Sequence, residues 1–276
     1  VLLVIDGVRM NNAIYRSGHL QNAITIDENA LSTLDVSYGP GALAYGSDAI
    51  GGLIHFKTKN PLPTGQSTAN WSGALGLRIG SAARESGINA ELTYQSAKWS
   101  SYTVVSASQF GDLRAGEKRP EAYPDFGKRP TYAERINGND VAQINDDPNR
   151  QIGSGYDQID VLQKFNWQAH KRLLIGANLQ YSSSSNVPRY DRLTEMRNGQ
   201  LRFAEWYYGP QDRVLAAITA NYDAEQFWAD QVRLIISTQA IAEDRFDRSF
   251  GSPWREESLV DVSLSAITLD AHKKLR

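Results

Sequence analysis

The chain has 276 residues, a formal net charge of −2, 41% hydrophobic residues and no cysteine. The near-neutral charge gives no support for nucleic acid as a partner. The lack of cysteine excludes disulfides, thiolate metal sites and cysteine nucleophiles. No run reaches the roughly 18 uninterrupted apolar residues of a membrane-spanning helix. Composition alone therefore leaves two classes open, a soluble protein and a β-barrel.

The first ten residues are two short apolar runs around Asp6 and Gly7. An Asp-Gly pair flanked by strand-forming residues is a strong hairpin signal. Residues 11–22 are polar and typical of a loop. The start of the chain therefore predicts a β-hairpin followed by an irregular segment.

The next predicted element is a short helix capped by Asp27. An aspartate side chain can accept a hydrogen bond from the backbone of the first helical turn. We expect this helix to bury Leu31 and Leu34.

The segment Leu34–Lys57 is rich in glycine and reads as strand, one helical turn, tight turn and strand. A phosphate-binding loop would need Lys and Ser or Thr directly after its last glycine, and these are absent. The spacing of a dinucleotide-binding fingerprint is absent too. A plain glycine turn in an α+β domain remains the alternative. The residues that we expect to be structural here and in the first hairpin are Asp6, Gly7, Gly39, Pro40, Tyr45, Gly46, Gly51 and Gly52.

The rest of the chain shows period-two alternation. Residues 61–70 form a proline-bearing linker, and about eight alternating segments of roughly ten residues follow. One apolar and one polar face per strand is typical of a membrane β-barrel with a polar lumen, and a soluble sandwich gives the same alternation.

The connections between these segments favour the barrel. Alternate connections are short, and the others are long at 112–154, 184–210 and 244–254, with 82–85 as a short exception. Outer-membrane barrels have short periplasmic turns and long extracellular loops. Aromatic residues gather near the short turns, where an interfacial girdle would lie: Trp99, Tyr102, Phe165, Trp167, Tyr222, Phe227 and Trp228.

The glycine-rich segment, together with the hairpin before it, resembles the end of the plug domain of TonB-dependent outer-membrane receptors. The resemblance implies a mainly β fold: residues 1–60 as the C-terminal part of a plug, 61–70 as a linker, and 71–276 as the N-terminal part of a transmembrane barrel. Plugged transporters have about 22 strands. We therefore expect the chain to be a fragment that does not transport alone.

The resemblance also suggests what binds. The run Arg16-Ser-Gly-His19 in the expected apical loop is similar to the plug of haem and haemoprotein receptors, and the later segment Leu193–Gln211 is similar to bacteroidete members of that group. Histidine and tyrosine can both ligate haem iron, so the candidate ligand-binding residues are Tyr15, Arg16 and His19. The alternative is that His19 is one polar residue of a solvated loop. The resemblance implies no intrinsic cofactor, with haem or an Fe(III)-siderophore as the transported ligand.

The long connections supply a second candidate surface. Tyrosine, tryptophan and arginine dominate binding hot spots, and the candidates are Tyr190, Arg192, Trp206, Tyr207 and Tyr208. The alternative is that these side chains pack on one another above the barrel. The two interpretations are equally open.

The resemblance implies an importer in the bacterial outer membrane. Its partners would be outer-membrane lipid, a TonB–ExbB–ExbD complex acting through an N-terminal box outside these residues, and a haemoprotein or surface lipoprotein. The alternatives are an adhesin or structural barrel and a secreted β-rich hydrolase. We expect no enzyme, because the four histidines fall in separate elements and no catalytic or metal-binding motif is present.

Overall fold

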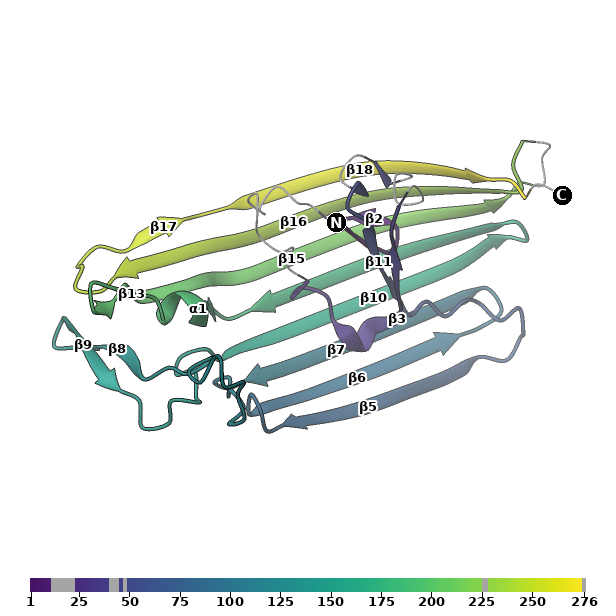
Figure 1. The fold of residues 1–276 in the computed structure, drawn as a ribbon. Helices are drawn as coiled ribbons and strands as arrows, with labels where there is room; N and C mark the ends of the chain where they lie inside the picture. The colour runs from purple at the N-terminus through teal and green to yellow at the C-terminus, as the bar shows by residue number, and fades with distance from the viewer. Residues whose placement is uncertain (11–22, 40–44, 47–48, 225–227, 275–276) are drawn as a thin grey trace.

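The computed structural model describes residues 1–10, 23–39, 45–46, 49–224 and 228–274. It contains a four-stranded sheet near the N-terminus, which we call the small sheet, and a ten-stranded sheet, which we call the large sheet. Figure 1 shows the small sheet lying across one face of the large sheet. We call the covered face of the large sheet its inner face and the opposite one its outer face.

The small sheet has the strand order β2-β1-β4-β3. Its strands are β1 (Leu2–Ile5), β2 (Val8–Arg9), β3 (Leu31–Ser37) and β4 (Leu53–Thr58). The predicted Asp-Gly hairpin is present between β1 and β2, since Ile5 pairs with Val8. Asp6 and Gly7 both have positive φ, 50° and 88°. These are the conformations of a type I′ turn, which explains the residue types.

The helix predicted after Asp27 is shorter than expected. Asp27 does act as a cap, since its Oδ1 accepts a hydrogen bond from Asn29 N at 2.9 Å. However, the helix is a single 3₁₀ turn, η1 (Glu28–Ala30), and Leu31 already belongs to β3. Leu34 is exposed rather than buried. The reason is that β3 pairs with β4, which holds these residues in an extended edge strand.

The glycine-rich turn lies partly outside the described residues, which include neither Pro40 nor residues 41–44. Gly39, Gly46 and Gly52 have φ of 78°, 98° and 112°. Gly51 does not have a positive φ. Only Gly52 of the Gly-Gly pair therefore needs the conformational freedom of glycine.

The large sheet is an antiparallel array in chain order, apart from short strands at its edge and on β15. Its eight longer strands have 11 to 21 residues: β5 (Asn70–Gly80), β6 (Glu85–Gln95), β7 (Trp99–Phe110), β10 (Tyr156–His170), β11 (Leu173–Ser184), β15 (Phe203–Asp223), β16 (Gln231–Ser249) and β18 (Asp261–His272). They correspond to the alternating segments that the sequence predicts. Their outer strands β5 and β18 do not pair with each other, so the described sheet is open.

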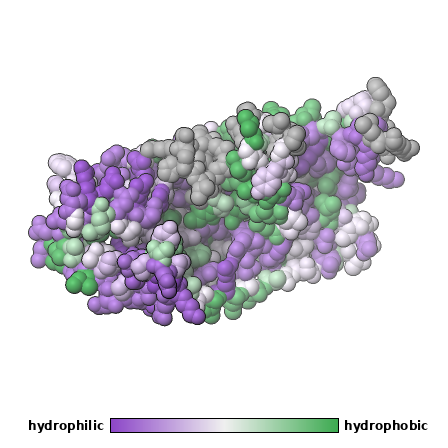
Figure 2. Space-filling model, viewed as in Figure 1, coloured by the Kyte–Doolittle hydropathy of each residue, from purple (hydrophilic) through white to green (hydrophobic). Residues whose placement is uncertain are grey.

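The connections alternate in length, as expected. The long ones gather at one end of the sheet (Figure 1). They carry small elements of their own: β8 (Thr131–Ile136), β9 (Asn139–Ile144), β12 (Val187–Pro188), α1 (Tyr190–Leu193), β13 (Met196–Arg197), β14 (Gln200–Leu201) and β17 (Glu256–Ser258). In Figure 2 this end of the molecule is predominantly hydrophilic.

Two of the predicted long connections are shorter than expected. Strand β15 begins at Phe203 and β16 continues to Ser249, so both strands extend into segments predicted as loops. The two strands remain paired over these added residues, for example at Tyr207 and Phe246. The ladder shifts register between Tyr208 and Gln211, around a proline that offers no backbone donor. The sequence breaks the strand pattern there, but the strand continues past the irregularity.

The two faces of the large sheet have the reverse of the polarity that a soluble protein needs. The outer face exposes large apolar side chains: Trp71, Leu75, Leu77, Ile79, Ile88, Leu92, Leu179, Val214, Ile218, Ile236, Ile267 and Leu269. The inner face buries polar ones: Ser100, Ser106, Asp160, Lys164, Asn166, Asn178, Gln180, Ser182, Arg213, Ser237 and Gln239. Apolar-out and polar-in alternation is what lipid-facing strands require. It argues against the soluble sandwich.

Aromatic residues near the short turns lie mostly on the outer face. Trp99 and Trp167 stack there with ring centroids 5.3 Å apart, and Phe165, Tyr222 and Trp228 are also exposed. Tyr102 departs from the prediction. It is buried on the inner face, where its hydroxyl donates to Glu91 at 3.0 Å. Phe227 lies outside the described residues.

No helix in the described part of the chain is long and apolar enough to cross a membrane.

Candidate functional site

The candidate site is the contact between the small sheet and the inner face of the large sheet. An apolar cluster forms its centre. Side chains of β1, β2 and β4, including Ile5 and Phe56, pack there against Leu215 and Ala217 of β15 and Ile235 of β16. A second, smaller apolar cluster joins Ala30 to Val104 and Leu162 of the large sheet. Between the clusters the contact includes many polar groups.

The β1–β2 turn makes the densest set of these polar contacts. The Asp6 carboxylate accepts hydrogen bonds from Thr58 N and Oγ1, at 2.9 and 2.6 Å, which ties it to β4. The Lys164 ammonium on β10 lies 3.1 Å from Asp6 Oδ2. Asn178 and Gln180 of β11 donate to the same oxygen, at 2.8 and 3.5 Å. The small sheet is therefore anchored to two strands of the large sheet through one carboxylate.

Gly7 lets the turn approach the large sheet closely. A Cβ on Gly7 would lie 2.9 Å from the Ile235 side chain, and its φ is positive. Its backbone N–H donates to His55 Nε2 at 3.1 Å. Burial lowers the pKa of His55 below its usual range. Because Nε2 accepts a hydrogen bond, the ring is neutral in this arrangement, with its proton on Nδ1.

Further polar contacts connect the two sheets nearer the long connections. Ser106 donates to Asp27 at 2.7 Å, and Gln158 donates to the Ile24 carbonyl at 2.6 Å. On the other side, Gln239 donates to the Arg9 carbonyl at 2.9 Å. Each contact is a single hydrogen bond to a backbone carbonyl or a side chain. Such bonds contribute about 0.5–1.5 kcal/mol each, so the interface is held by many weak contacts.

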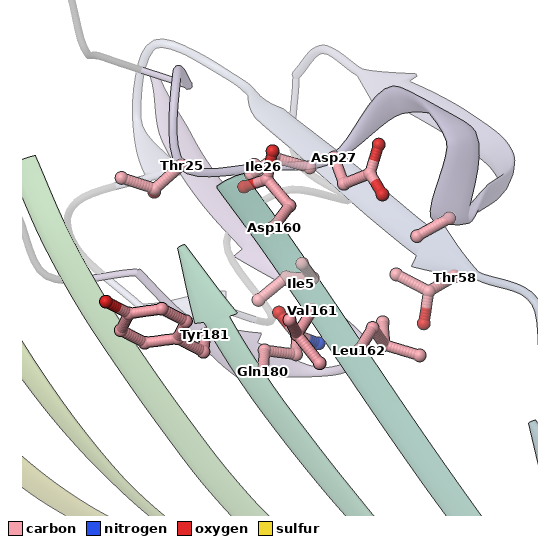
Figure 3. A pocket seen from close by; sticks show the side chains of 11 residues that line it. Ile5, Thr25, Ile26, Asp27, Thr58, Asp160, Val161, Leu162, Gln180 and Tyr181 are labelled. Atoms are coloured by element: carbon pink, nitrogen blue, oxygen red, sulfur yellow. The ribbon is translucent and has the colours of Figure 1, made fainter. Parts of the chain in front are cut away.

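Two sizeable cavities lie along this interface. One, of about 240 Å³, lies between the segment before η1 and strands β5, β6, β7 and β10. The other, of about 500 Å³, lies nearer the short turns and is lined by Asp6, His55, Lys57, Lys164 and Arg233 with several hydroxyl and amide side chains. A third is shown in Figure 3, between Ile5 and Ile26 on one side and Asp160, Gln180 and Tyr181 on the other. At about 20 Å³ it has room for a water molecule and not for a ligand.

A second group of aromatic and basic side chains lies where β15 enters the long connection. The Arg189 guanidinium lies 5.0 Å from the Trp206 ring centroid and 5.8 Å from that of Tyr208. It also donates to the Tyr208 hydroxyl at 3.1 Å. Arginine over aromatic rings is a favourable cation–π arrangement.

The five candidate residues of the long connections are placed differently. Trp206 is buried, with 8% exposure, among Leu193 and Phe203, and Tyr208 packs beside them. Tyr207 stacks on Phe246 at 5.1 Å. Arg192 is ion-paired with Glu195. Tyr190 remains exposed, at 45%. Trp206, Tyr207 and Tyr208 lie on β15 itself.

The candidate residues of the apical loop, Tyr15, Arg16 and His19, lie outside the described residues. Within the described part of the chain, no group of three or more His, Cys, Asp or Glu side chains could hold a metal ion.

Sequence reasoning missed Lys164, Asn178, Gln180 and Arg233 on the inner face. A signal was present, since Lys164 and Arg233 are charged residues within alternating strands, at positions that face a polar lumen. What the sequence could not give is the partner, because Asp6 is more than 150 residues away along the chain.

Residues 1–53 match the family described as TonB-dependent Receptor Plug Domain. The chain is 28% identical over 221 residues to the hemin receptor of Yersinia pestis, covering 74% of this chain and 27% of that protein. Over 57 residues it is 44% identical to the vitamin B12 transporter BtuB of Vibrio vulnificus (strain YJ016), covering 21% of this chain and 9% of that protein.

Among solved structures, the chain resembles a mutant of the ferric enterobactin receptor PfeA of Pseudomonas aeruginosa in complex with enterobactin. The TM-score is 0.61 at 14% identity, over 97% of this chain and 38% of that one. At this identity the similarity concerns the fold. The chain thus spans well under half the length of these proteins.

The plug match and the strand array with its polar inner face together define a plug domain packed on part of a β-barrel wall. The match of residues 1–53 to the plug family agrees with the resemblance that the sequence shows, and the fold of the chain is that of the ferric enterobactin receptor. The family that matches residues 1–53 and the similar proteins named above are receptors and transporters rather than enzymes. The small sheet is accordingly the plug sheet, and the large sheet is barrel wall.

Proposed function

We propose that the chain supplies the ligand-facing half of the plug and part of the wall of an outer-membrane importer for a scarce, bulky nutrient. Haem or an iron–siderophore complex is the cargo that we favour, and it would be transported rather than kept as a cofactor. A TonB–ExbB–ExbD complex would supply the energy.

One observation carries this proposal: a folded plug sheet is held on a polar barrel face by many weak contacts, with Asp6 at their centre. A structural barrel or an adhesin has no need for a separate domain bound inside its wall. A domain that must be displaced during import has to be bound by contacts that can break one after another. Single hydrogen bonds around a small apolar cluster meet that condition.

The apolar outer face supports the outer membrane as the location. Lipid would cover Leu75, Leu77, Ile218 and the other exposed apolar side chains of that face. A haemoprotein or a surface lipoprotein that delivers cargo would meet the long-connection end, which is hydrophilic (Figure 2).

Haem as cargo is supported by the similarity to the hemin receptor, which covers most of this chain. In the sequence, Tyr15 and His19 offer side chains that can ligate haem iron. A siderophore is the second candidate, supported by the fold that the chain shares with a ferric enterobactin receptor.

The test is a visible-absorbance titration of the full-length receptor in detergent with haemin. We expect a saturable Soret shift that weakens in His19→Ala and is unchanged in His170→Ala, a control at a short turn. A ferric catecholate siderophore serves as the competing ligand, followed by quenching of tryptophan fluorescence. A siderophore signal without a Soret shift would assign the receptor to siderophores, and neither signal would contradict both cargoes.

A further inference from the structure

Asp6 fills a site on the barrel wall that is built for an anion. We propose that Lys164, Asn178, Gln180 and Arg233 form an anion-binding cradle, which Asp6 occupies while the plug is seated and which an anionic group of the cargo occupies when the plug moves aside. This inference rests on the proposed import function and specifies its cargo as a carboxylate- or phosphate-bearing one.

The first argument is convergence. Lys164, Asn178 and Gln180 all direct their donors at the same oxygen, Asp6 Oδ2, at 3.1, 2.8 and 3.5 Å. Arg233, on β16, donates to the Asp6 carbonyl at 3.0 Å. These four donors belong to the wall and the acceptor belongs to the plug, while one donor from the plug itself, Thr58 Oγ1, shares Asp6 Oδ2 at 2.6 Å. A carboxylate receptor in a protein is built in the same way, from a cation and amide N–H groups that surround one oxygen.

The second argument is the charge that remains when Asp6 leaves. Lys164 is only 5% exposed while the plug covers it. When the plug moves aside, water reaches the Lys164 ammonium, but this cation loses its ion-pair partner, and the amide groups of Asn178 and Gln180 lose their acceptor. The Arg233 Nε is also buried without a hydrogen-bond partner among the described residues. Displacement of the plug is therefore easier if another anion replaces the Asp6 carboxylate.

The third argument is space. The cavity of about 500 Å³ adjoins Asp6, Lys164, Asn178 and Arg233. This is within the range of volumes that hold small ligands. Among the described residues that line it, Asp6 is the only acidic one, whereas Lys57, Lys164 and Arg233 are basic. A cargo that carries carboxylates would therefore find a complementary surface on the short-turn side of the plug.

The cradle can be tested without transport. In the full-length receptor, Asp6→Asn removes the charge and keeps a residue that suits the type I′ turn before glycine. Asp6→Gly, also suited to that turn, is the second variant. The thermal midpoint of each variant is followed in detergent while citrate or inorganic phosphate is added, with sodium chloride at matched ionic strength as the reference.

We expect the Tm of Asp6→Asn to rise by a few degrees and to saturate with citrate, as a ligand that binds only the folded state requires. The parent, whose cradle is filled, should not respond. Adding Lys164→Gln to Asp6→Asn should abolish the response. Adding Lys57→Gln, which lines the same cavity but does not contact Asp6, should preserve it.

An equal response in the parent, or a response that survives Lys164→Gln, would overturn the proposal. The same holds if Asp6→Asn and Asp6→Gly fold and show no response. If neither variant folds, Asp6 is a structural anchor whose place no other anion can take, and the cradle is again refuted. Because no step requires import, a failure here is distinct from a failure of the haemin and siderophore titrations.

Discussion

Arg248 of β16 and Asp140 of β9 form a bidentate ion pair, with Nη1–Oδ2 and Nη2–Oδ1 distances of 2.6 and 2.9 Å. Both side chains are almost fully buried, at 4% and 2% exposure. The pair joins the β8–β9 hairpin, within the first long connection, to a wall strand more than 100 residues later. It fixes the position of an extended connection that would otherwise be held by few tertiary contacts.

This pair predicts a pH-dependent stability. The hydrogen bonds from Arg248, and then the backbone N–H of Gly251, hold the pKa of Asp140 below its usual range. A carboxyl with a lowered folded-state pKa binds fewer protons when folded than when unfolded, in the pH range between the two values. The stabilisation from Asp140 is complete at pH values above the pKa of an aspartate in the unfolded chain, about 3.9. This stabilisation is lost as the pH falls through the lower pKa of Asp140 in the folded protein.

We therefore expect Asp140→Asn to lower the free energy of unfolding by about 1.5–3 kcal/mol at pH 7, because Arg248 loses its charged hydrogen bonds to Asp140 but keeps its ion pair with Glu205. The difference from the parent should shrink toward pH 3. Asp125→Asn, which removes an exposed pair with Lys128, is the control and should change little. Denaturation in detergent at both pH values measures this, and a difference independent of pH would contradict the explanation.

The glycine pair of the plug makes a second prediction. A Cβ at Gly52 would meet the Ser37 carbonyl at 3.0 Å, in a backbone with φ of 112°. Gly52→Ala should cost about 1–3 kcal/mol. Gly51→Ala, next to it and without positive φ, should cost less. Limited proteolysis of the plug reports on both variants, and equal sensitivity would show that the backbone conformation of Gly52 is not what matters.

The outer face makes a third prediction. Ile218 is 58% exposed on β15, so a lysine there would be harmless in a soluble protein. On a lipid-facing strand it should cost about 2–4 kcal/mol. We expect Ile218→Lys to reduce assembly into the outer membrane, while Thr219→Lys, whose side chain points to the inner face, is better tolerated. Membrane fractionation after expression compares the two, and equal assembly would argue against lipid on the outer face.

Variants of the aromatic residues at the long-connection end should distinguish a role in packing from a role in ligand recognition. Trp206→Ala empties a buried position in the cluster with Leu193 and Phe203, and it should destabilise the protein by about 3–5 kcal/mol. Tyr190→Ala removes an exposed side chain and should change the stability by no more than about 0.5 kcal/mol. If Tyr190 contacts cargo, its variant should weaken ligand binding at unchanged stability. Thermal denaturation combined with the haemin and siderophore titrations measures both quantities.

Local chemistry explains what could be predicted from the sequence. The Asp6-Gly7 hairpin follows from the φ values that a type I′ turn demands, and the wall strands follow from the alternation that lipid on one side and water on the other impose. The helix after Asp27 is shorter than the sequence predicts, because Leu31 pairs with β4 as the first residue of β3. No local signal in the sequence reveals this pairing. Strand β15 was predicted too short because Gly209 and Pro210 look like a strand end, although pairing with β16 resumes on both sides.

The interface itself could not be predicted, for a different reason. Lys164 and Asn178 are recognisable as inward-facing polar residues, but the sequence does not say which residue of the plug they meet. Tyr102 is a different case: its place beside an aromatic-rich turn suggests the outer face, but the alternation of β7 puts it on the face opposite to Trp99, where its hydroxyl donates to Glu91.

The turn at Asp6 and Gly7 restricts which sequences this chain can tolerate. Position 6 favours a residue that accepts positive φ and also carries an acceptor oxygen; aspartate and, without the charge, asparagine meet both demands, whereas glycine meets only the first. Position 7 needs positive φ and no side chain, since Ile235 stands against it. Four demands therefore fall on two adjacent residues. A saturation-mutagenesis scan should find this dipeptide among the least permissive positions of the chain. A smaller residue at 235 should relieve the steric contact of an enlarged residue 7 but not the strain of its positive φ.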